Sequence, residues 1–75
     1  MPTLPTLSGR NAVRIFEKEG WQIARQGGSH IILVKEGHMV TLSVPDHREI
    51  AKGTLRSLIR SSGLTVEQFI ALVHK

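Results

Sequence analysis

Two adjacent glycines, Gly27 and Gly28, divide a polar segment from the aliphatic run Ile31–Val34, and no other feature limits the fold of this chain as much. Paired glycines permit backbone conformations that close a tight turn. A short run rich in β-branched residues that follows such a turn is typical of a β-strand. The sequence therefore predicts a hairpin with strands at residues 21–26 and 30–36, turned at Gly27-Gly28. Trp21, Ile23 and Arg25 are expected on one face of the first strand.

Helical patterns lie on both sides of this hairpin. Apolar residues recur at helical spacing between Ser8, a typical N-cap residue, and Gly20, a typical stop. A second helix is expected over Thr54–Ser62, ending at Gly63. A capping-box pattern, Thr65 with Gln68, then opens a short last helix.

A third strand is predicted over Met39–Val44, where Val40, Leu42 and Val44 alternate with polar or smaller residues and Pro45 ends the ladder. The order helix, three antiparallel strands and one or two helices predicts an α+β domain of two layers, with the helices on one face of the sheet. The run Ile31–Val34 is apolar on both faces. Its second face is either covered or an interaction surface.

Length and charge narrow the possible functions. With 75 residues we expect one domain over residues 8–75, preceded by an irregular arm at residues 1–7 that has two prolines and is not a signal peptide. No apolar run approaches a membrane span, and the lack of cysteine fits a cytoplasmic protein. The formal charge of +4 favours a nucleic acid or an acidic partner.

Basic residues recur every four positions at Lys52, Arg56 and Arg60, which gives a basic stripe on the second helix. Lys52 lies just before the predicted start of that helix, where free backbone N–H groups also attract phosphate. Arg60 is better explained as a solvated residue near a helix end. Arg25 precedes the turn and either reaches the same phosphate or stays in solvent.

Three groups of segments together resemble the HicA toxins of bacterial and archaeal toxin–antitoxin pairs, and the similarity runs from about Ser8 to the C-terminus. They are Leu7–Arg10 with Gly20-Trp21, then Arg25–His30, then Val44–His47 with Lys52–Ile59. The resemblance implies a fold like a double-stranded-RNA-binding domain and a metal-independent mRNA endoribonuclease that needs no cofactor. It also implies neutralisation by a HicB-type antitoxin. The family's catalytic histidine falls on His30, whereas the second histidine that many members carry next to it is replaced by Ile31.

We therefore expect His30 to transfer a proton during RNA cleavage, with Arg25, Ser29, Lys52 and Arg56 contacting RNA phosphate. His47 is a second proton-transfer group, an RNA contact or a loop residue whose imidazole hydrogen-bonds the backbone, and the last of these is favoured. The histidine spacings and the few carboxylates give no metal site. The alternative function is an RNA-binding module of the same fold that does not cut RNA, because the positive charge and the fold are equally consistent with binding and with cleavage.

Overall fold

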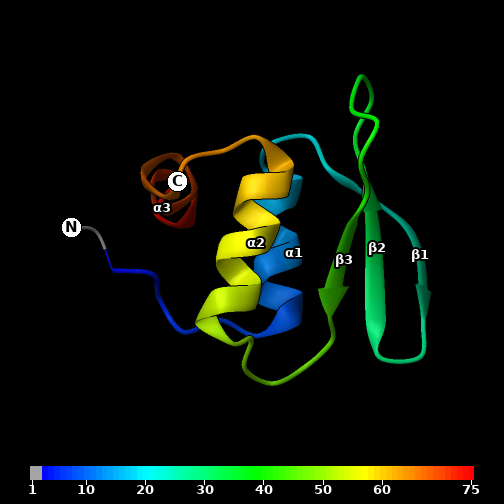
Figure 1. Cartoon of the computed structure of the whole chain (residues 1–75), viewed down its shortest axis with the longest axis horizontal. Coiled ribbons are helices and arrows are strands. Elements are labelled where there is room, and N and C mark those ends of the chain that lie inside the picture. The colour runs from blue at the N-terminus through cyan, green and yellow to red at the C-terminus, as the bar shows by residue number, and fades with distance from the viewer. Residues whose placement is uncertain (1–2) are drawn as a thin grey trace.

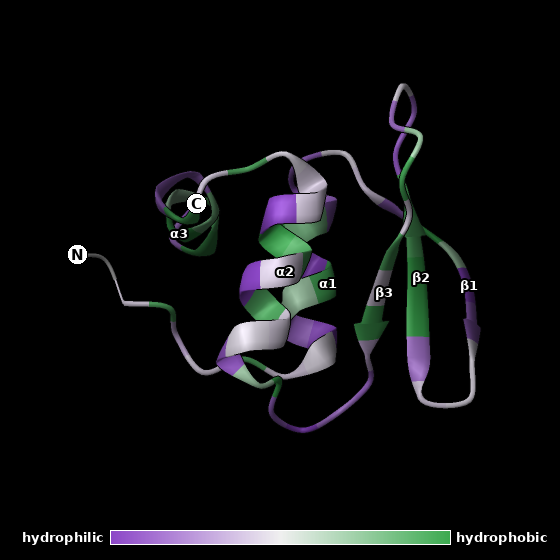
Figure 2. Cartoon of the chain, viewed as in Figure 1, coloured by the Kyte–Doolittle hydropathy of each residue, from purple (hydrophilic) through white to green (hydrophobic). Residues whose placement is uncertain are grey.

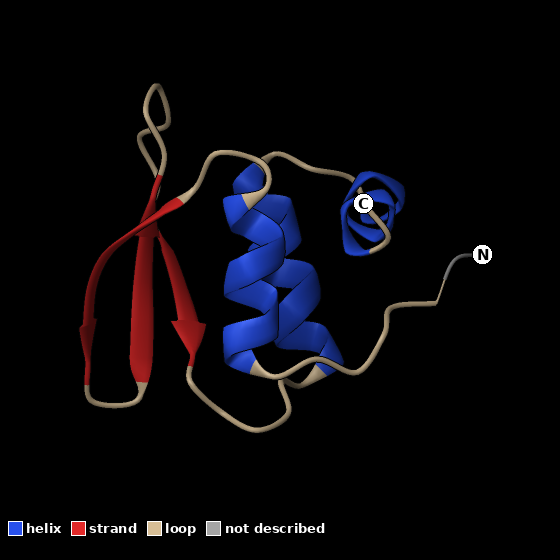
Figure 3. Cartoon of the chain, turned by 180° about the vertical axis from the view of Figure 1, so that it is seen from behind, coloured by secondary structure: helices blue, strands red, loops and turns tan. Residues whose placement is uncertain are grey.

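The computed structural model describes residues 3–75 as a helix, three strands and two further helices (Figure 1). The elements are α1 (Gly9–Glu17), β1 (Gln22–Gly27), β2 (His30–Val34), β3 (Leu42–Pro45), α2 (Lys52–Ser62) and α3 (Val66–Val73). The strands form one antiparallel sheet in the order β1-β2-β3, and Figure 3 shows the helices on one side of it. The predicted two-layer α+β fold, like that of a double-stranded-RNA-binding domain, is confirmed.

Helix α1 begins at the predicted capping serine. The Oγ of Ser8 accepts a hydrogen bond from the backbone N–H of Asn11 at 3.1 Å, which satisfies one of the free N–H groups of the first turn. The apolar stripe of α1 is buried, and the ring of Phe16 lies 5.2 Å from that of Phe69 in α3. Trp21, Phe16 and Phe69 are all buried in the core.

The central strand β2 buries only one of its two apolar faces. Ile31 and Leu33 are buried beneath the helices and pair with Val44 and Leu42 of β3. His30, Ile32 and Val34 alternate with them and lie on the other side of the sheet, which we call the outer face. No helix covers the outer face (Figure 3), so the second face of the aliphatic run is open in this chain.

The third strand is shorter than the alternation predicts. β3 begins at Leu42 rather than Met39, because pairing with β2 ends at Leu33 and Leu42. Met39 is fully exposed and Val40 is half-exposed, so the prediction that Val40 shares the buried face is wrong. The connection between β2 and β3 projects beyond the end of the sheet (Figure 1), and Met39 and Val40 lie within it.

The C-terminal helices follow the sequence signals closely. α2 starts at Lys52, two residues earlier than predicted, and ends at Gly63, whose φ of +87° is the left-handed conformation common at helix ends. Thr65 and Gln68 form both hydrogen bonds of the predicted capping box, at 2.9 and 3.1 Å. This cap starts α3, which buries Phe69 and Leu72 against the core.

Residues 3–7 form neither helix nor strand, and Met1 and Pro2 of the predicted N-terminal arm lie outside the described residues. Leu4 and Leu7 are nevertheless buried in the core. The N–H of Ile50 donates to the carbonyl oxygen of Leu7 at 2.8 Å, and the Nζ of Lys52 donates to that of Leu4. The arm is therefore packed against the helices. Within residues 3–75, no helix has the length and apolar character to cross a membrane.

Candidate active site

The turn between β1 and β2 lies one residue later than the sequence predicts. β1 continues through Gly27, and Gly28 with Ser29 forms a two-residue turn. Gly28 has a φ of +58° whereas the φ of Ser29 is not positive, which is the pattern of a type II′ turn. Gly28 is therefore the glycine that the turn requires. Gly27 has an ordinary φ, and a Cβ there would meet nothing within 4 Å.

His30 is the first residue of β2 and lies on the outer face with its side chain exposed. Its strand neighbours are Gly27 on one side and Pro45 on the other. The Nδ1 of His30 lies 3.3 Å from the Oγ of Ser29. This contact holds the ring through one nitrogen, and no hydrogen bond to Nε2 exists among residues 3–75. The exposed imidazole thus contacts the protein through Nδ1.

Arg25 shares the outer face with His30 because of a bulge in β1. Ile23 pairs with Leu33 on the helix side, but the register shifts before Arg25, which pairs with Ile32. The extra residue turns Arg25 to the outer face, so the prediction that Ile23 and Arg25 share a face is wrong. Since Ile32 follows His30 by two residues, Arg25 is a diagonal cross-strand neighbour of the histidine.

A network around Asp46 fixes the turn against α1. The backbone N–H of Asp46 donates to the carbonyl oxygen of Ser29 at 2.7 Å, and its carboxylate accepts bonds from Arg10 at 3.3 and 3.4 Å. Gly9 donates to the carbonyl oxygen of His47 at 2.9 Å, and a Cβ on Gly9 would overlap the carbonyl oxygen of Pro45. The N-terminus of α1 is therefore held against the end of β3.

Arg10 is a residue at this site that the sequence analysis missed, because helical periodicity only places it toward water. Its position in the first turn of α1 is the signal that was available. Acidic residues are favoured at helix N-termini and basic ones are not. A basic residue in the first turn of α1 does not favour the helix, so its presence indicates a role other than helix stability.

The two remaining predicted residues lie in the helical layer. Lys52 is the first residue of α2, and its Nζ uses one of three donors on the carbonyl oxygen of Leu4. Arg56 lies one turn further along and borders, with Arg60, a hollow beside residues 63–66. Ser29 in the β1–β2 turn therefore lies next to His30 and Arg25 on the outer face of the sheet, whereas Arg56 lies on α2, away from these three residues.

One end of the molecule brings together polar groups and charged groups of both signs. It consists of the β1–β2 turn, residues 46–51 and the first turns of α1 and α2 (Figure 1), and we call it the turn end. Figure 2 shows hydrophilic residues at the start of β2, along residues 46–49 and at the start of α2. The first turns of α1 and α2 themselves hold no acidic residue, but Asp46 pairs with Arg10 at the start of α1. With Arg10, Arg48 and Lys52 against Asp46 and Glu49, the turn end has a slight excess of positive charge. Among residues 3–75, no three His, Asp or Glu side chains gather to form a metal site.

The fold defines a small α+β domain of the kind found in double-stranded-RNA-binding domains, with an exposed histidine at the turn end. A family model described as the HicA toxin of bacterial toxin–antitoxin systems matches residues 9–64. The chain therefore belongs to the HicA toxin family, whose members are known as mRNA interferases, and is the toxin component of a toxin–antitoxin pair. A comparison with curated proteins finds none that matches it.

Proposed function

We propose that this toxin is a metal-independent endoribonuclease that cleaves mRNA in the cytoplasm and that a HicB-type antitoxin neutralises it. The main support for this proposal is the structural environment of His30. Its side chain is exposed at the start of a strand, and its Nδ1 lies 3.3 Å from the hydroxyl of Ser29. A general acid or base needs this combination of fixed orientation and open access.

The reaction uses the nucleophile that RNA itself carries. A base removes the proton of the 2′-hydroxyl, the 2′-oxygen attacks the adjacent phosphorus, and the bond from phosphorus to the 5′-oxygen breaks. The leaving 5′-oxygen takes up a proton. The products are a 2′,3′-cyclic phosphate and a 5′-hydroxyl. His30 supplies one of the two proton transfers, each of which contributes about 10²–10⁴-fold in enzymes of this kind.

Arg25 and Ser29 beside His30, together with Lys52 and Arg56 on α2, hold the RNA phosphates in this proposal. Arg25 lies beside His30 on the outer face, and Ser29 is next to it in the turn. Lys52 keeps two donors beyond its bond to Leu4, and Arg56 extends the positive charge along α2. These contacts engage the backbone of RNA rather than its base edges, so they predict weak sequence preference.

The chemistry of the product ends tests this proposal. A 5′-labelled RNA is incubated with the toxin, and the fragments are treated with a phosphatase or a kinase. Fragments with 2′,3′-cyclic phosphate and 5′-hydroxyl ends support the proposal, whereas 5′-phosphate and 3′-hydroxyl ends contradict it. Salt-dependent binding without any cleavage points instead to the alternative, an RNA-binding module that does not cut.

A further inference from the structure

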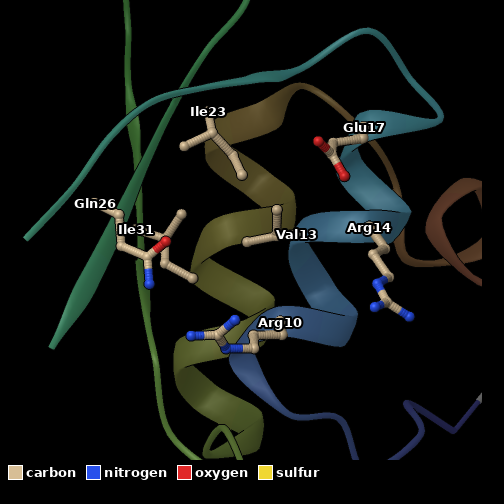
Figure 4. A pocket seen from close by; sticks show the side chains of 7 residues that line it. All are labelled: Arg10, Val13, Arg14, Glu17, Ile23, Gln26 and Ile31. Carbon is tan, nitrogen blue, oxygen red and sulfur yellow. The ribbon is translucent and has the colours of Figure 1, made fainter.

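A groove between α1 and β1 remains uncovered on the helix side of the sheet. We call it the α1–β1 groove. It is lined by Val13 and Arg14 of α1 and by Ile23 and Ile31 of the sheet, and its volume is about 140 Å³ (Figure 4). It exists because α1 packs mainly on β2 and β3, so β1 extends past the helical layer. All six residues of β1 are exposed as a result.

The floor of the groove is aliphatic. Val13 and Ile31 are buried, with 4% and 2% of their surfaces exposed. Ile23 lies on the helix side of the sheet, opposite Leu33, yet 47% of its surface is exposed. A volume near 150 Å³ suffices for a group the size of benzene. The groove therefore has room for one apolar side chain, which would bury the exposed part of Ile23.

The helix side of the groove carries three charged residues, Arg10, Arg14 and Glu17, at successive turns of α1 (Figure 4). Arg10 is paired with Asp46, whereas Arg14 forms no ion pair within residues 3–75. A carboxylate beside the apolar group would therefore meet an available guanidinium.

We infer that the α1–β1 groove is where the antitoxin docks, through an apolar side chain flanked by an acidic residue. This inference rests on the proposed function in one respect: it takes from it that an antitoxin binds this toxin, and adds where the antitoxin binds. The required chemistry, an apolar anchor with an adjacent negative charge, matches the apolar floor and the guanidinium of Arg14, which is unpaired in the part of the chain that the structure describes.

Other occupants fit the groove less well. Single-stranded RNA binds on exposed aromatic side chains, but the three aromatic residues Phe16, Trp21 and Phe69 are buried. A second copy of this chain would bring another formal charge of +4 toward the two arginines. An acidic protein partner avoids both difficulties.

The position of the groove explains how docking there also affects the active site. Gln26 lines the groove, and the next residue, Gly27, is the strand neighbour of His30. Arg10 belongs both to the groove and to the network that holds Ser29. His30 lies on the opposite face of the sheet, so a partner seated in the groove obstructs access of RNA to His30 by extending around the edge of β1 to the turn end.

The test compares two variants of the full chain that each place a charge on an exposed aliphatic residue of the sheet. Ile23→Glu changes the groove, and Val34→Glu is the matched control on the outer face, where 37% of Val34 is exposed. Binding to the purified cognate antitoxin is measured by calorimetry, RNA cleavage is measured separately, and circular dichroism checks folding. Arg14→Ala is a milder third variant.

The inference predicts that Ile23→Glu weakens antitoxin binding at least 100-fold and Arg14→Ala several-fold, while Val34→Glu changes it less than threefold. The Ile23→Glu toxin should still cut RNA, now without inhibition by antitoxin. Loss of binding in Val34→Glu alone overturns the inference and assigns docking to the outer face. Reduced RNA binding in Ile23→Glu with unchanged antitoxin affinity also overturns it, because the groove then contacts RNA. If the wild type does not cut RNA, the proposed function fails, yet the binding data still decide where the antitoxin docks.

Discussion

The carboxylate of Asp46 lies 3.3 Å from the Nε of Arg10, and this pair joins the first turn of α1 to the end of β3. The same Asp46 donates its N–H to the carbonyl oxygen of Ser29, the neighbour of His30. Exposed ion pairs contribute only about 0.2–1 kcal/mol to stability. The main effect of the Arg10–Asp46 pair is therefore to position the β1–β2 turn rather than to stabilise the fold.

Asp46→Asn tests that role. Asparagine keeps the backbone bond to Ser29 but removes the charge that faces Arg10. We expect RNA cleavage to fall about 3- to 10-fold, comparable to the loss of one hydrogen bond. RNA affinity should stay equal or rise, since Arg10 then carries unopposed charge. Single-turnover cleavage and fluorescence anisotropy separate the two effects, and a parallel loss of both contradicts the positioning role.

Ser29→Ala removes the oxygen that contacts the Nδ1 of His30. We expect cleavage to slow by about tenfold or less, the range of one hydrogen bond, because the ring loses its fixed orientation. Ser43→Ala is the control, since Ser43 is exposed and pairs with Ile32 on the same face. Equal rates for the two variants would show that the Ser29 hydroxyl does not orient the imidazole.

Gly27→Val tests why a glycine stands opposite His30. The backbone does not require it, because φ is ordinary and a Cβ meets nothing within 4 Å. A valine there would stand about 5 Å from the histidine Cβ and crowd the ring. We expect at least about a tenfold loss of cleavage, since precise access governs such reactions, with unchanged melting temperature. Gln22→Val, at the far end of β1, should leave the rate unchanged.

Gly9→Ala tests the contact between α1 and β3. The new methyl group would overlap the carbonyl oxygen of Pro45, so the chain must shift. We expect the free energy of unfolding to fall by about 1–3 kcal/mol, the usual cost of overpacking. Gly53→Ala, in α2 with open space around it, should instead raise stability by up to about 1 kcal/mol. Urea denaturation measures both, and equal effects at the two positions contradict this account.

The regular elements were predictable because their signals are local. Ser8, Gly63 and the Thr65–Gln68 capping box act within one helical turn, and each is found where the sequence predicts it. The alternation of Leu42 and Val44 also survives in β3. Val40 does not follow this alternation because it lies beyond the last residue pair between β2 and β3. The sequence pattern does not indicate where that pairing ends.

The site was only partly predictable because its geometry depends on register and on long-range contacts. The bulge that turns Arg25 toward the face of His30 has no local signature in the sequence. Arg10 meets Asp46 across 36 positions of sequence, which helical periodicity cannot reveal. The bond between Lys52 and Leu4 likewise depends on how the N-terminal arm packs.

The role of His30 is tested most directly by cleavage of a labelled mRNA in EDTA by wild-type toxin and His30→Ala. His74→Ala, at the C-terminal end of α3, serves as a histidine control. Circular dichroism confirms that all three are folded. We predict that the wild type and His74→Ala cut in EDTA, and that His30→Ala is slower by about 10²-fold or more. Equal cleavage by folded His30→Ala, or wild-type cleavage that EDTA abolishes, contradicts a metal-independent reaction carried by His30.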